Sequence, residues 1–300
     1  MNPLEAEIAV TALKATGNYK VLRRLDLEND SRLTRRRSRE SLIGLALDTE
    51  TTGFDHPQDQ IIELGLVAFE YDPHSGEIIR LVDRYSGCED PGAPLSEEVK
   101  LVTGISDDLL RGTRLDDGRV EELAGKASLV IAHNAAFDRK FVESRFPLFA
   151  RLPWACTLAQ IDWQKELISS RTLEYLLFRY GYFIDAHRAV NDAEGLLGLL
   201  LERLPRSGTP LFRELLTRAH EITARISAVG APFDSKELLK QRGYRWNDGA
   251  DGAPRCWWRE VPARDEEQEL QFLREQVYPR GDSRSVQVVK VDALQRFSAR

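Results

Sequence analysis

The chain has 300 residues, of which 42% are hydrophobic and 30% are charged, as in an ordinary soluble globular protein. No apolar stretch approaches the roughly 20 residues of a transmembrane helix, and no basic-then-apolar signal opens the sequence, so we expect a cytoplasmic protein that contacts no membrane. The formal net charge of −6 argues, taken alone, against a nucleic-acid-binding protein.

Residues 1–40 are expected to form a leader ahead of the first domain. Leu4–Ala15 has apolar residues at helical spacing, and Tyr19–Leu25 alternates like an edge strand. The charged stretch that follows centres on three consecutive arginines at 35–37. A solvated linker is the usual meaning of such a run, and a basic arm that touches phosphates is the alternative.

An apolar run, Leu42–Leu47, ends in Asp48 and predicts a buried strand. A carboxylate at the end of a buried strand is costly unless it is paired or binds a metal. Glu50 follows two residues later, and in an extended chain it shares a face with Asp48. Hard oxygen ligands suit Mg²⁺ or Mn²⁺. The alternative is a strand that ends in a polar turn, with both acids in water.

Two adjoining segments carry a resemblance to a known family. Asp-Thr-Glu-Thr-Thr-Gly at 48–53, followed by Ile-Ile-Glu-Leu-Gly at 61–65, resembles the first motif of the DnaQ-like 3′–5′ exonucleases of the DEDDh branch. That branch includes the proofreading subunit of bacterial replicative DNA polymerase. The resemblance implies that the two acids of the motif bind metal and that Thr51 and Thr52 lie beside the substrate.

Residues 41–204 are expected to form one α/β domain. Ile61–Tyr71 and Glu77–Tyr85 read as the two strands of an antiparallel hairpin. Ser96 is expected to cap a short helix. The family usually has a histidine near the terminal nucleotide at the position of Thr103, so that contact is not expected here. The resemblance implies a ribonuclease H-like mixed β-sheet flanked by helices.

The apolar run Leu129–Ala132 predicts a buried strand, and His-Asn-Ala-Ala-Phe-Asp follows it directly at the start of a helix. These six residues resemble the second motif of the family. The resemblance implies that Asp138 is a metal ligand and that His133 and Phe137 lie against the terminal nucleotide. The alternatives are a core aromatic at Phe137 and a hydrogen-bonding residue at the helix start for His133.

His187 and Asp192 lie five residues apart, ahead of an apolar helical repeat. Such an offset turns through about 500° on a helix, so the two side chains would not share a helical face. We therefore expect His187 on the loop that enters the helix and Asp192 within the helix. The pair resembles the third motif of the family, which implies that His187 is the catalytic base and Asp192 the fourth metal ligand.

Residues 205–300 are expected to form a small α+β domain of unknown role. Leu211–Ala228 reads as one amphipathic helix, and Asp234 as the cap of the next. Tyr244–Trp246 and Cys256–Val261 read as a hairpin. The Arg and Trp residues interleaved in this hairpin suit stacking on single-stranded bases, although tryptophan in a small domain is more often part of the core.

The motifs together predict a metal-dependent 3′–5′ exonuclease with two ions, Mg²⁺ or Mn²⁺. It would hydrolyse single-stranded or frayed 3′ ends of DNA to nucleoside 5′-monophosphates, in proofreading or repair. One alternative is an exoribonuclease or oligonucleotidase that acts on RNA. The other is a non-catalytic nucleic-acid-binding module. The sequence indicates no particular partner protein.

Overall fold

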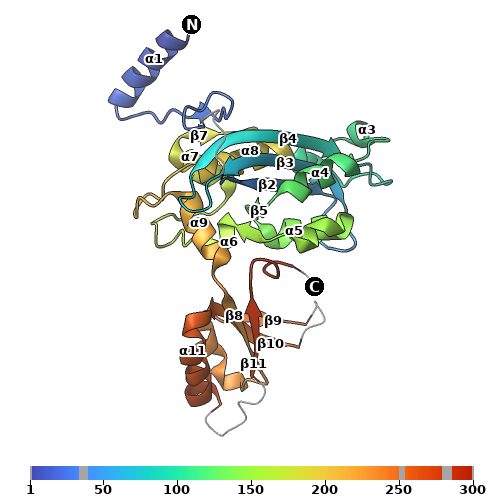
Figure 1. Cartoon of the computed structure of the whole chain (residues 1–300), viewed down its shortest axis with the longest axis vertical. Helices are drawn as coiled ribbons and strands as arrows, with labels where there is room; N and C mark the ends of the chain where they lie inside the picture. Colours follow the sequence, from blue (N-terminus) through green and yellow to red (C-terminus); the bar gives the residue numbers. More distant parts are fainter. Residues whose placement is uncertain (1, 34–39, 250–253, 279–285, 299–300) are drawn as a thin grey trace. The chain divides into compact units, whose positions relative to one another are not determined.

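The computed structural model describes residues 2–33, 40–249, 254–278 and 286–298, in two compact units, Met1–Arg218 (unit 1) and Ala219–Arg300 (unit 2) (Figure 1). The three arginines at 35–37, expected in a solvated linker or alternatively in a basic arm, lie outside the described residues. No helix in the described part of the chain is long and apolar enough to cross a membrane.

Unit 1 is built on a five-stranded mixed sheet with the strand order β4-β3-β2-β5-β6. Its strands are β2 (Leu42–Thr51), β3 (Ile61–Tyr71), β4 (Ile78–Cys88), β5 (Leu129–Ala132) and β6 (Trp154–Cys156). β2, β3 and β4 pair antiparallel, whereas β5 and β6 run parallel to β2 and to each other. A separate parallel pair joins β1 (Arg23–Arg24) to β7 (Tyr182–Phe183).

Helices flank this sheet (Figure 1). The helices of this part of the chain are α1 (Pro3–Ala15), α2 (Glu97–Thr103), α3 (Asp107–Leu110), α4 (Asp117–Lys126), α5 (Ala135–Arg145), α6 (Thr157–Gln160), α7 (Leu173–Tyr180), α8 (Ala189–Leu200) and α9 (Leu211–His220), with a 3₁₀ turn at Pro147–Arg151, and α1 is drawn apart from the sheet. α8 lies against β2 and β3, and α5 lies against β2, β5 and β6. The ribonuclease H-like arrangement that the motifs implied is therefore confirmed.

β3 is buried along its whole length, as its nearly continuous apolar sequence predicts. It nevertheless contains two acids, Glu63 and Glu70. Each forms an ion pair with an arginine, Arg188 for the first and Arg80 for the second. Pairing offsets the cost of burying a carboxylate. Glu63 has a further role at the start of α8, described below.

Unit 2 follows the chain order β-α-β-β-α-β. Its elements are β8 (Thr223–Val229), α10 (Lys236–Gln241), β9 (Arg245–Asn247), β10 (Cys256–Pro262), α11 (Glu266–Phe272), which continues as a π-helical turn (Leu273–Val277), and β11 (Val286–Val291). The four strands form an antiparallel sheet in the order β11-β8-β10-β9. This topology is the split β-α-β arrangement of ferredoxin-like domains.

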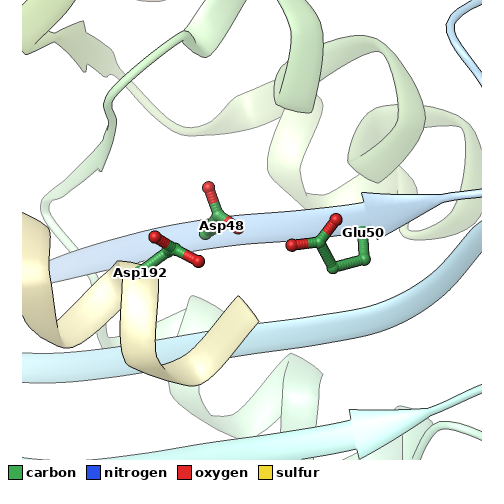
Figure 2. Close-up of side chains that lie close together, drawn as sticks. All are labelled: Asp48, Glu50 and Asp192. Carbon is green, nitrogen blue, oxygen red and sulfur yellow. The ribbon is translucent and has the colours of Figure 1, made fainter. Parts of the chain in front are cut away.

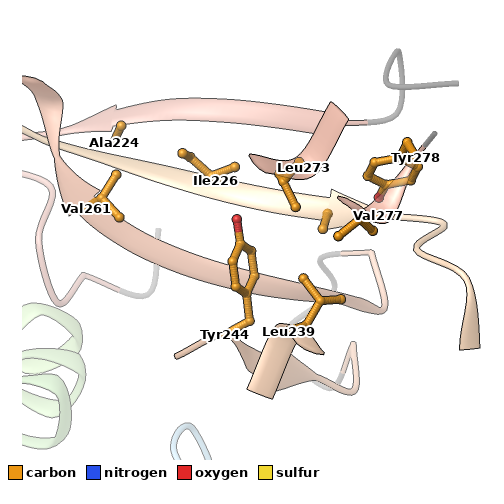
Figure 3. Close-up of a cluster of buried hydrophobic side chains, with 9 residues drawn as sticks. Ala224, Ile226, Leu239, Tyr244, Val261, Leu273, Val277 and Tyr278 are labelled. Atoms are coloured by element: carbon orange, nitrogen blue, oxygen red, sulfur yellow. The ribbon is translucent and has the colours of Figure 1, made fainter. Parts of the chain in front are cut away.

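The core of unit 2 lies between one face of its sheet and its helices (Figure 3). It consists of Ala224, Ile226 and Ala228 of β8, Leu239 of α10, Tyr244, Val261 of β10, and Leu273, Val277 and Tyr278. Trp257 packs against this cluster, so one of the two adjacent tryptophans belongs to the core, as strand alternation predicts.

Two predicted features of unit 2 are wrong. The helix predicted over Leu211–Ala228 ends at His220, and Thr223–Val229 is a strand whose residues alternate between buried and partly exposed. β-Branched residues and this two-residue period favour the strand over a continued helix. Asp234 does not cap α10, because it lies within a 3₁₀ turn whose Ser235 N–H bonds the carbonyl of Pro232.

Candidate functional site

Three carboxylates from two elements meet beside the central sheet of unit 1. Asp48 and Glu50 lie on β2, and Asp192 lies on α8. One oxygen from each lies within 4.8 Å of the others, and Figure 2 shows the three groups turned toward a common space. The predicted shared face of Asp48 and Glu50 is thus confirmed, because β2 continues through both acids to Thr51.

Asp138 stands outside this trio but next to it. It lies on the first turn of α5 and is 3% exposed. Its Oδ1 accepts hydrogen bonds from the backbone N–H and the hydroxyl of Thr49, at 3.1 and 2.9 Å. Because Thr49 lies between the two acids of β2, these bonds hold Asp138 beside Asp48. The charge of Asp138 helps to raise the pKa of Asp48.

The start of α8 is seated directly on β3. A Cβ at Gly65 would lie 2.2 Å from the carbonyl carbon of Ala189, so a glycine is required for the helix to approach the strand this closely. Glu63, two residues earlier on the same face of β3, accepts a 3.0 Å hydrogen bond from the N–H of Ala189. The guanidinium of Arg188 donates to the same carboxylate at 2.8 Å and 3.1 Å.

This junction determines where Asp192 lies. Arg188 precedes the first residue of α8, and its backbone N–H donates to Asp192 Oδ2 at 3.2 Å. Glu63 and Glu50 lie directly opposite each other on β3 and β2, an arrangement that repels unless a cation is near. Sequence reasoning missed the role of Glu63 and Arg188, although an acid inside an apolar strand was a signal that such a partner exists.

His187 lies on the loop before α8, as predicted, and its side chain is exposed. Its backbone has φ of +62°, in the left-handed region that residues with a side chain rarely adopt. Holding such a residue there costs about 1–2 kcal/mol. Strained backbone of this kind clusters at functional sites, and His187 is five residues from Asp192 in the carboxylate cluster.

Burial raises the pKa of all four carboxyl groups. The pKa of Asp48 lies well above its usual value, because desolvation adds to the charges of Asp138, Asp192 and Glu50. Desolvation likewise raises the pKa of Glu50 to about 8. It raises the pKa of Asp138 to about 7, although the bonds from Thr49 favour the ionised form, and that of Asp192 to about 6. The metal-free site therefore resists ionisation.

These pKa shifts predict how the metal-free protein responds to pH. A carboxyl whose pKa is higher in the folded than in the unfolded state loses stabilisation as pH rises through the folded value. We therefore expect the urea concentration at half-unfolding, measured in chelator, to decrease as the pH is raised from about 4 to about 8. A divalent cation binds the ionised groups and should offset this fall. A midpoint in chelator that rises over the same range, or one that Mn²⁺ leaves unchanged, would contradict the prediction.

The two threonines predicted to contact substrate form hydrogen bonds within their own loop. Thr51 is buried, and its hydroxyl donates to the carbonyl of Gly53 at 2.6 Å. The hydroxyl of Thr52 donates to Asp59 Oδ1 at 2.7 Å and accepts from the N–H of Gln60 at 3.1 Å. These bonds shape the turn that follows Glu50.

Phe137 belongs to an aromatic group beside the acids. Its ring centre lies 6.0 Å from that of Phe54 and 5.0 Å from that of Phe141. Phe54 follows the first motif and is 83% exposed, although a large apolar side chain is favoured inside the protein. Sequence reasoning missed Phe54, whose only signal was an aromatic residue within a polar loop.

Both ring nitrogens of His133 bond groups of the protein. Nε2 lies 2.7 Å from the carbonyl oxygen of Arg171, and Nδ1 lies 2.8 Å from Oγ1 of Thr157. The carbonyl only accepts, so Nε2 carries the proton and Nδ1 accepts from the hydroxyl. Burial lowers the pKa of His133 to about 4, which keeps the ring neutral. Both ring nitrogens are therefore engaged within the protein.

The carboxylate cluster fits a hard divalent cation. Three acids with oxygens within 4.8 Å of one another repel strongly in a poorly solvated site, as their raised pKa values reflect. Oxygen donors in this number suit Mg²⁺ or Mn²⁺. The bonds to Asp138 from Thr49 and to Asp192 from Arg188 fix these two carboxylates in the way that supporting groups do at metal sites.

Comparisons with known proteins find the same class of domain. The RNase T family model, described as an exonuclease, matches residues 45–200. DNA polymerase III PolC-type of Thermotoga petrophila is 31% identical over 169 residues, which is 51% of this chain and 11% of that protein. The corresponding protein of Listeria welshimeri is 38% identical over 155 residues, or 49% of this chain and 10% of that protein. The chain spans about a tenth of the length of these curated relatives.

Solved structures that are similar include E. coli Exonuclease I in complex with an oligonucleotide, at a TM-score of 0.48 and 15% identity. That match covers 78% of this chain and 71% of the other. Exonuclease X in complex with 5′ overhanging duplex DNA matches at a TM-score of 0.40 and 19% identity, over 58% of this chain and 98% of the other.

Proposed function

The chain belongs to the RNase T family of exonucleases, in its DnaQ-like DEDDh branch, and on this premise we propose that it is a metal-dependent 3′–5′ exonuclease of DNA. The observation that carries the proposal is the meeting of Asp48, Glu50 and Asp192 within 4.8 Å, with Asp138 held beside them. The enzyme removes nucleotides from single-stranded or frayed 3′ ends, in proofreading or repair, and releases nucleoside 5′-monophosphates.

The four carboxylates would hold two divalent ions, Mg²⁺ or Mn²⁺. When bound, these ions supply Lewis-acid stabilisation of the negative charge that develops on the scissile phosphate. Asp48 is central to this set, because its carboxylate lies near Glu50 and Asp192 and is also raised in pKa by Asp138. The hydrogen bonds from Thr49 keep Asp138 in place for its share of the site.

His187 takes a proton from the attacking water. A histidine changes charge near neutral pH and so suits a general base. The water oxygen bonds to phosphorus while the bond from phosphorus to the 3′ oxygen of the preceding nucleotide breaks. That oxygen takes up a proton from solvent and becomes the new 3′-hydroxyl, and His187 releases its proton to solvent. The loop position of His187 and its strained backbone, just ahead of α8, support this role.

The substrate end lies against the aromatic group. Phe137 contacts the terminal base, and the exposed Phe54 extends its apolar surface. Thr51 and Thr52 contribute through the loop that their hydroxyls shape, and His133 contributes its ring face. Aromatic faces stack on bases without strong sequence preference, which suits a nuclease that degrades any sequence.

DNA is the preferred substrate in this proposal. The first and second motifs resemble those of the proofreading subunit closely, and the relatives are named as DNA polymerase III. Their polymerase activity is not proposed for this chain, which spans only about a tenth of their length. Discrimination against RNA depends on contacts to the 2′-hydroxyl, and the oligonucleotide experiment below measures it.

The experiment is degradation of matched DNA and RNA oligonucleotides, labelled at either end, with Mg²⁺, Mn²⁺ or chelator. We expect a 3′ label to be released at once as a mononucleotide, and a 5′-labelled strand to shorten stepwise. Chelator should abolish both. Faster loss of RNA would favour the exoribonuclease alternative. Tight binding without cleavage under any ion would favour the non-catalytic alternative.

Glu63→Gln tests the junction that positions α8. The substitution keeps the shape of the side chain but removes the charge that pairs with Arg188, so the start of α8 is held less firmly. Removing a group that supports metal ligands typically costs 10–100-fold in activity or metal affinity, and we expect about that loss in turnover. Initial rates at several Mn²⁺ concentrations separate the two effects.

Glu70→Gln is the matched control. Glu70 lies on the same strand, is buried, and forms its ion pair with Arg80. Both variants should lose stability, because each removes one partner of a buried pair. Only Glu63→Gln should lose turnover per folded molecule. Equal turnover in the two variants would show that Glu63 serves the fold alone.

A further inference from the structure

Unit 2 presents one face of its sheet away from its helices. Ala224, Ile226 and Ala228 alternate along β8 into the core shared with α10 and with Leu273 (Figure 3). The residues between them therefore point to the opposite face of the sheet. On β10 the core takes Trp257 and Val261, so Trp258 belongs to the opposite face, which we call the open face.

A row of side chains crosses all four strands of the open face. Trp258 on β10 lies opposite Arg245 on β9 and opposite Ser227 on β8. Ser227 in turn lies opposite Gln287 on β11. Residues directly opposite in a ladder point to the same face. The open face thus carries an aromatic ring at its centre, with a cation on one side and hydrogen-bonding groups on the other.

Two guanidinium groups lie over the partly exposed ring of Trp258. The Cζ of Arg225 lies 5.1 Å from the ring centre, and that of Arg245 lies 5.9 Å away. Arg225 approaches one acid, Glu260, at 3.6 Å, and Glu260 is also paired with Arg296. The Nε of Arg225 is buried and has no hydrogen-bond partner among the described residues. Among the residues that the structure describes, positive charge therefore exceeds negative charge around the ring.

This combination matches the chemistry of single-stranded nucleic acid. An aromatic ring on a four-stranded sheet offers a stacking platform for a base, and neighbouring arginines bind phosphates. The negative charge of the chain does not oppose such binding here, because Lys and Arg slightly outnumber Asp and Glu in residues 219–300. The overall charge of −6 comes from the rest of the sequence.

We propose that the open face of unit 2, centred on Trp258 with Arg225 and Arg245, is a second binding site for single-stranded nucleic acid, separate from the carboxylate cluster. The site grips a strand by one stacked base and two phosphates. Only the statement that the bound strand is the substrate of the nuclease rests on the proposed function. The binding itself needs no metal and no hydrolysis.

The test measures affinity of the full chain for a fluorescein-labelled oligothymidylate of about 20 nucleotides, a length beyond the site size of a single module. Chelator prevents cleavage, so that binding alone is measured. Trp258→Leu retains apolar volume but removes the stacking face, and we expect affinity to fall about 5- to 100-fold. Arg225→Gln combined with Arg245→Gln should make the plot of log affinity against log salt shallower by about 1.4.

Trp246→Leu is the matched control. Trp246 is a more exposed tryptophan, at 53%, and it lies opposite Trp257, on the other face of the sheet. Its substitution should leave affinity within about 2-fold of wild type, since a base stacked on Trp258 does not touch it. With Mn²⁺ present, Trp258→Leu should raise the KM for the long strand while leaving kcat, and hydrolysis of a short oligonucleotide, unchanged.

The outcomes separate this proposal from the proposed function. Binding that depends on Trp258 in a chain that hydrolyses nothing would support the second site and overturn the nuclease. Hydrolysis with wild-type affinity in Trp258→Leu would overturn the second site and leave the open face to a protein partner. If Trp258→Leu shows no cooperative unfolding transition, the variant that combines Arg225→Gln with Arg245→Gln serves as the test. A salt dependence of binding that is unchanged in this double variant would overturn the proposal.

Discussion

Asp48→Asn is expected to lower turnover by about 10³-fold or more while the protein remains folded. The carboxylate of Asp48 lies near those of Glu50 and Asp192, and its pKa also responds to Asp138, so it serves every part of the cluster. An uncharged amide of the same shape is a much weaker ligand for a hard cation. The loss should appear in kcat and should not be recovered by raising the substrate concentration.

The stability of the same variant should move in the opposite direction. In chelator, ionised Asp48 is unfavourable because it is desolvated and near three other acids. At pH values above neutral, its removal should therefore raise the urea concentration at half-unfolding. Glu70→Gln, which removes a buried and paired carboxylate of the same sheet, should lower the midpoint without changing turnover per folded molecule. Wild-type turnover in Asp48→Asn would place the chemistry elsewhere.

Local patterns were sufficient to predict the strands that carry the acids. The run before Asp48 and the continuous apolar sequence of Ile61–Tyr71 both became strands. Because side chains alternate along a strand, the shared face of Asp48 and Glu50 followed from their spacing alone. The position of His187 on a loop followed in the same way from helical geometry.

The junction between β3 and α8 was beyond such reasoning. It depends on contacts between residues more than a hundred positions apart, namely Gly65 against Ala189 and Glu63 with Arg188. Periodicity carries no information on which elements meet. The error at Thr223–Val229 had another origin, since its apolar residues also fit a helical repeat, and pairing with β10 and β11 adds to its two-residue alternation in selecting the strand.

The roles of the motif residues divide along the same line. Spacing placed Asp48 and Glu50 on one face of β2, because it acts through backbone geometry, whereas tertiary contacts bring Asp138 and Asp192 to them. The hydrogen bonds of Thr51, Thr52 and His133 depend instead on which residues the fold places next to them as hydrogen-bond partners. Buried polar groups find partners inside the protein wherever these are available, so a motif residue predicted to meet a ligand is often already bonded.

His187→Asn is expected to reduce kcat by about 10²–10⁴-fold, the usual contribution of a general base. Asparagine is suited to this position because it tolerates the left-handed backbone that His187 adopts at φ of +62°. The carboxylate cluster is untouched, so affinity for Mn²⁺ and the KM for substrate should barely change. His74→Asn, at an exposed histidine on a distant turn, is the matched control and should be fully active.

The pH profile separates a base from a residue that only begins a helix. In the wild type the rate should fall on the acid side, because a protonated imidazole accepts no further proton. Protons also compete with the ion for Glu50, whose pKa is about 8, so each rate must be measured at saturating Mn²⁺. Under these conditions the acid limb should flatten in His187→Asn. An unchanged limb with wild-type turnover per folded molecule would remove His187 from the mechanism and leave it a structural part of the loop before α8.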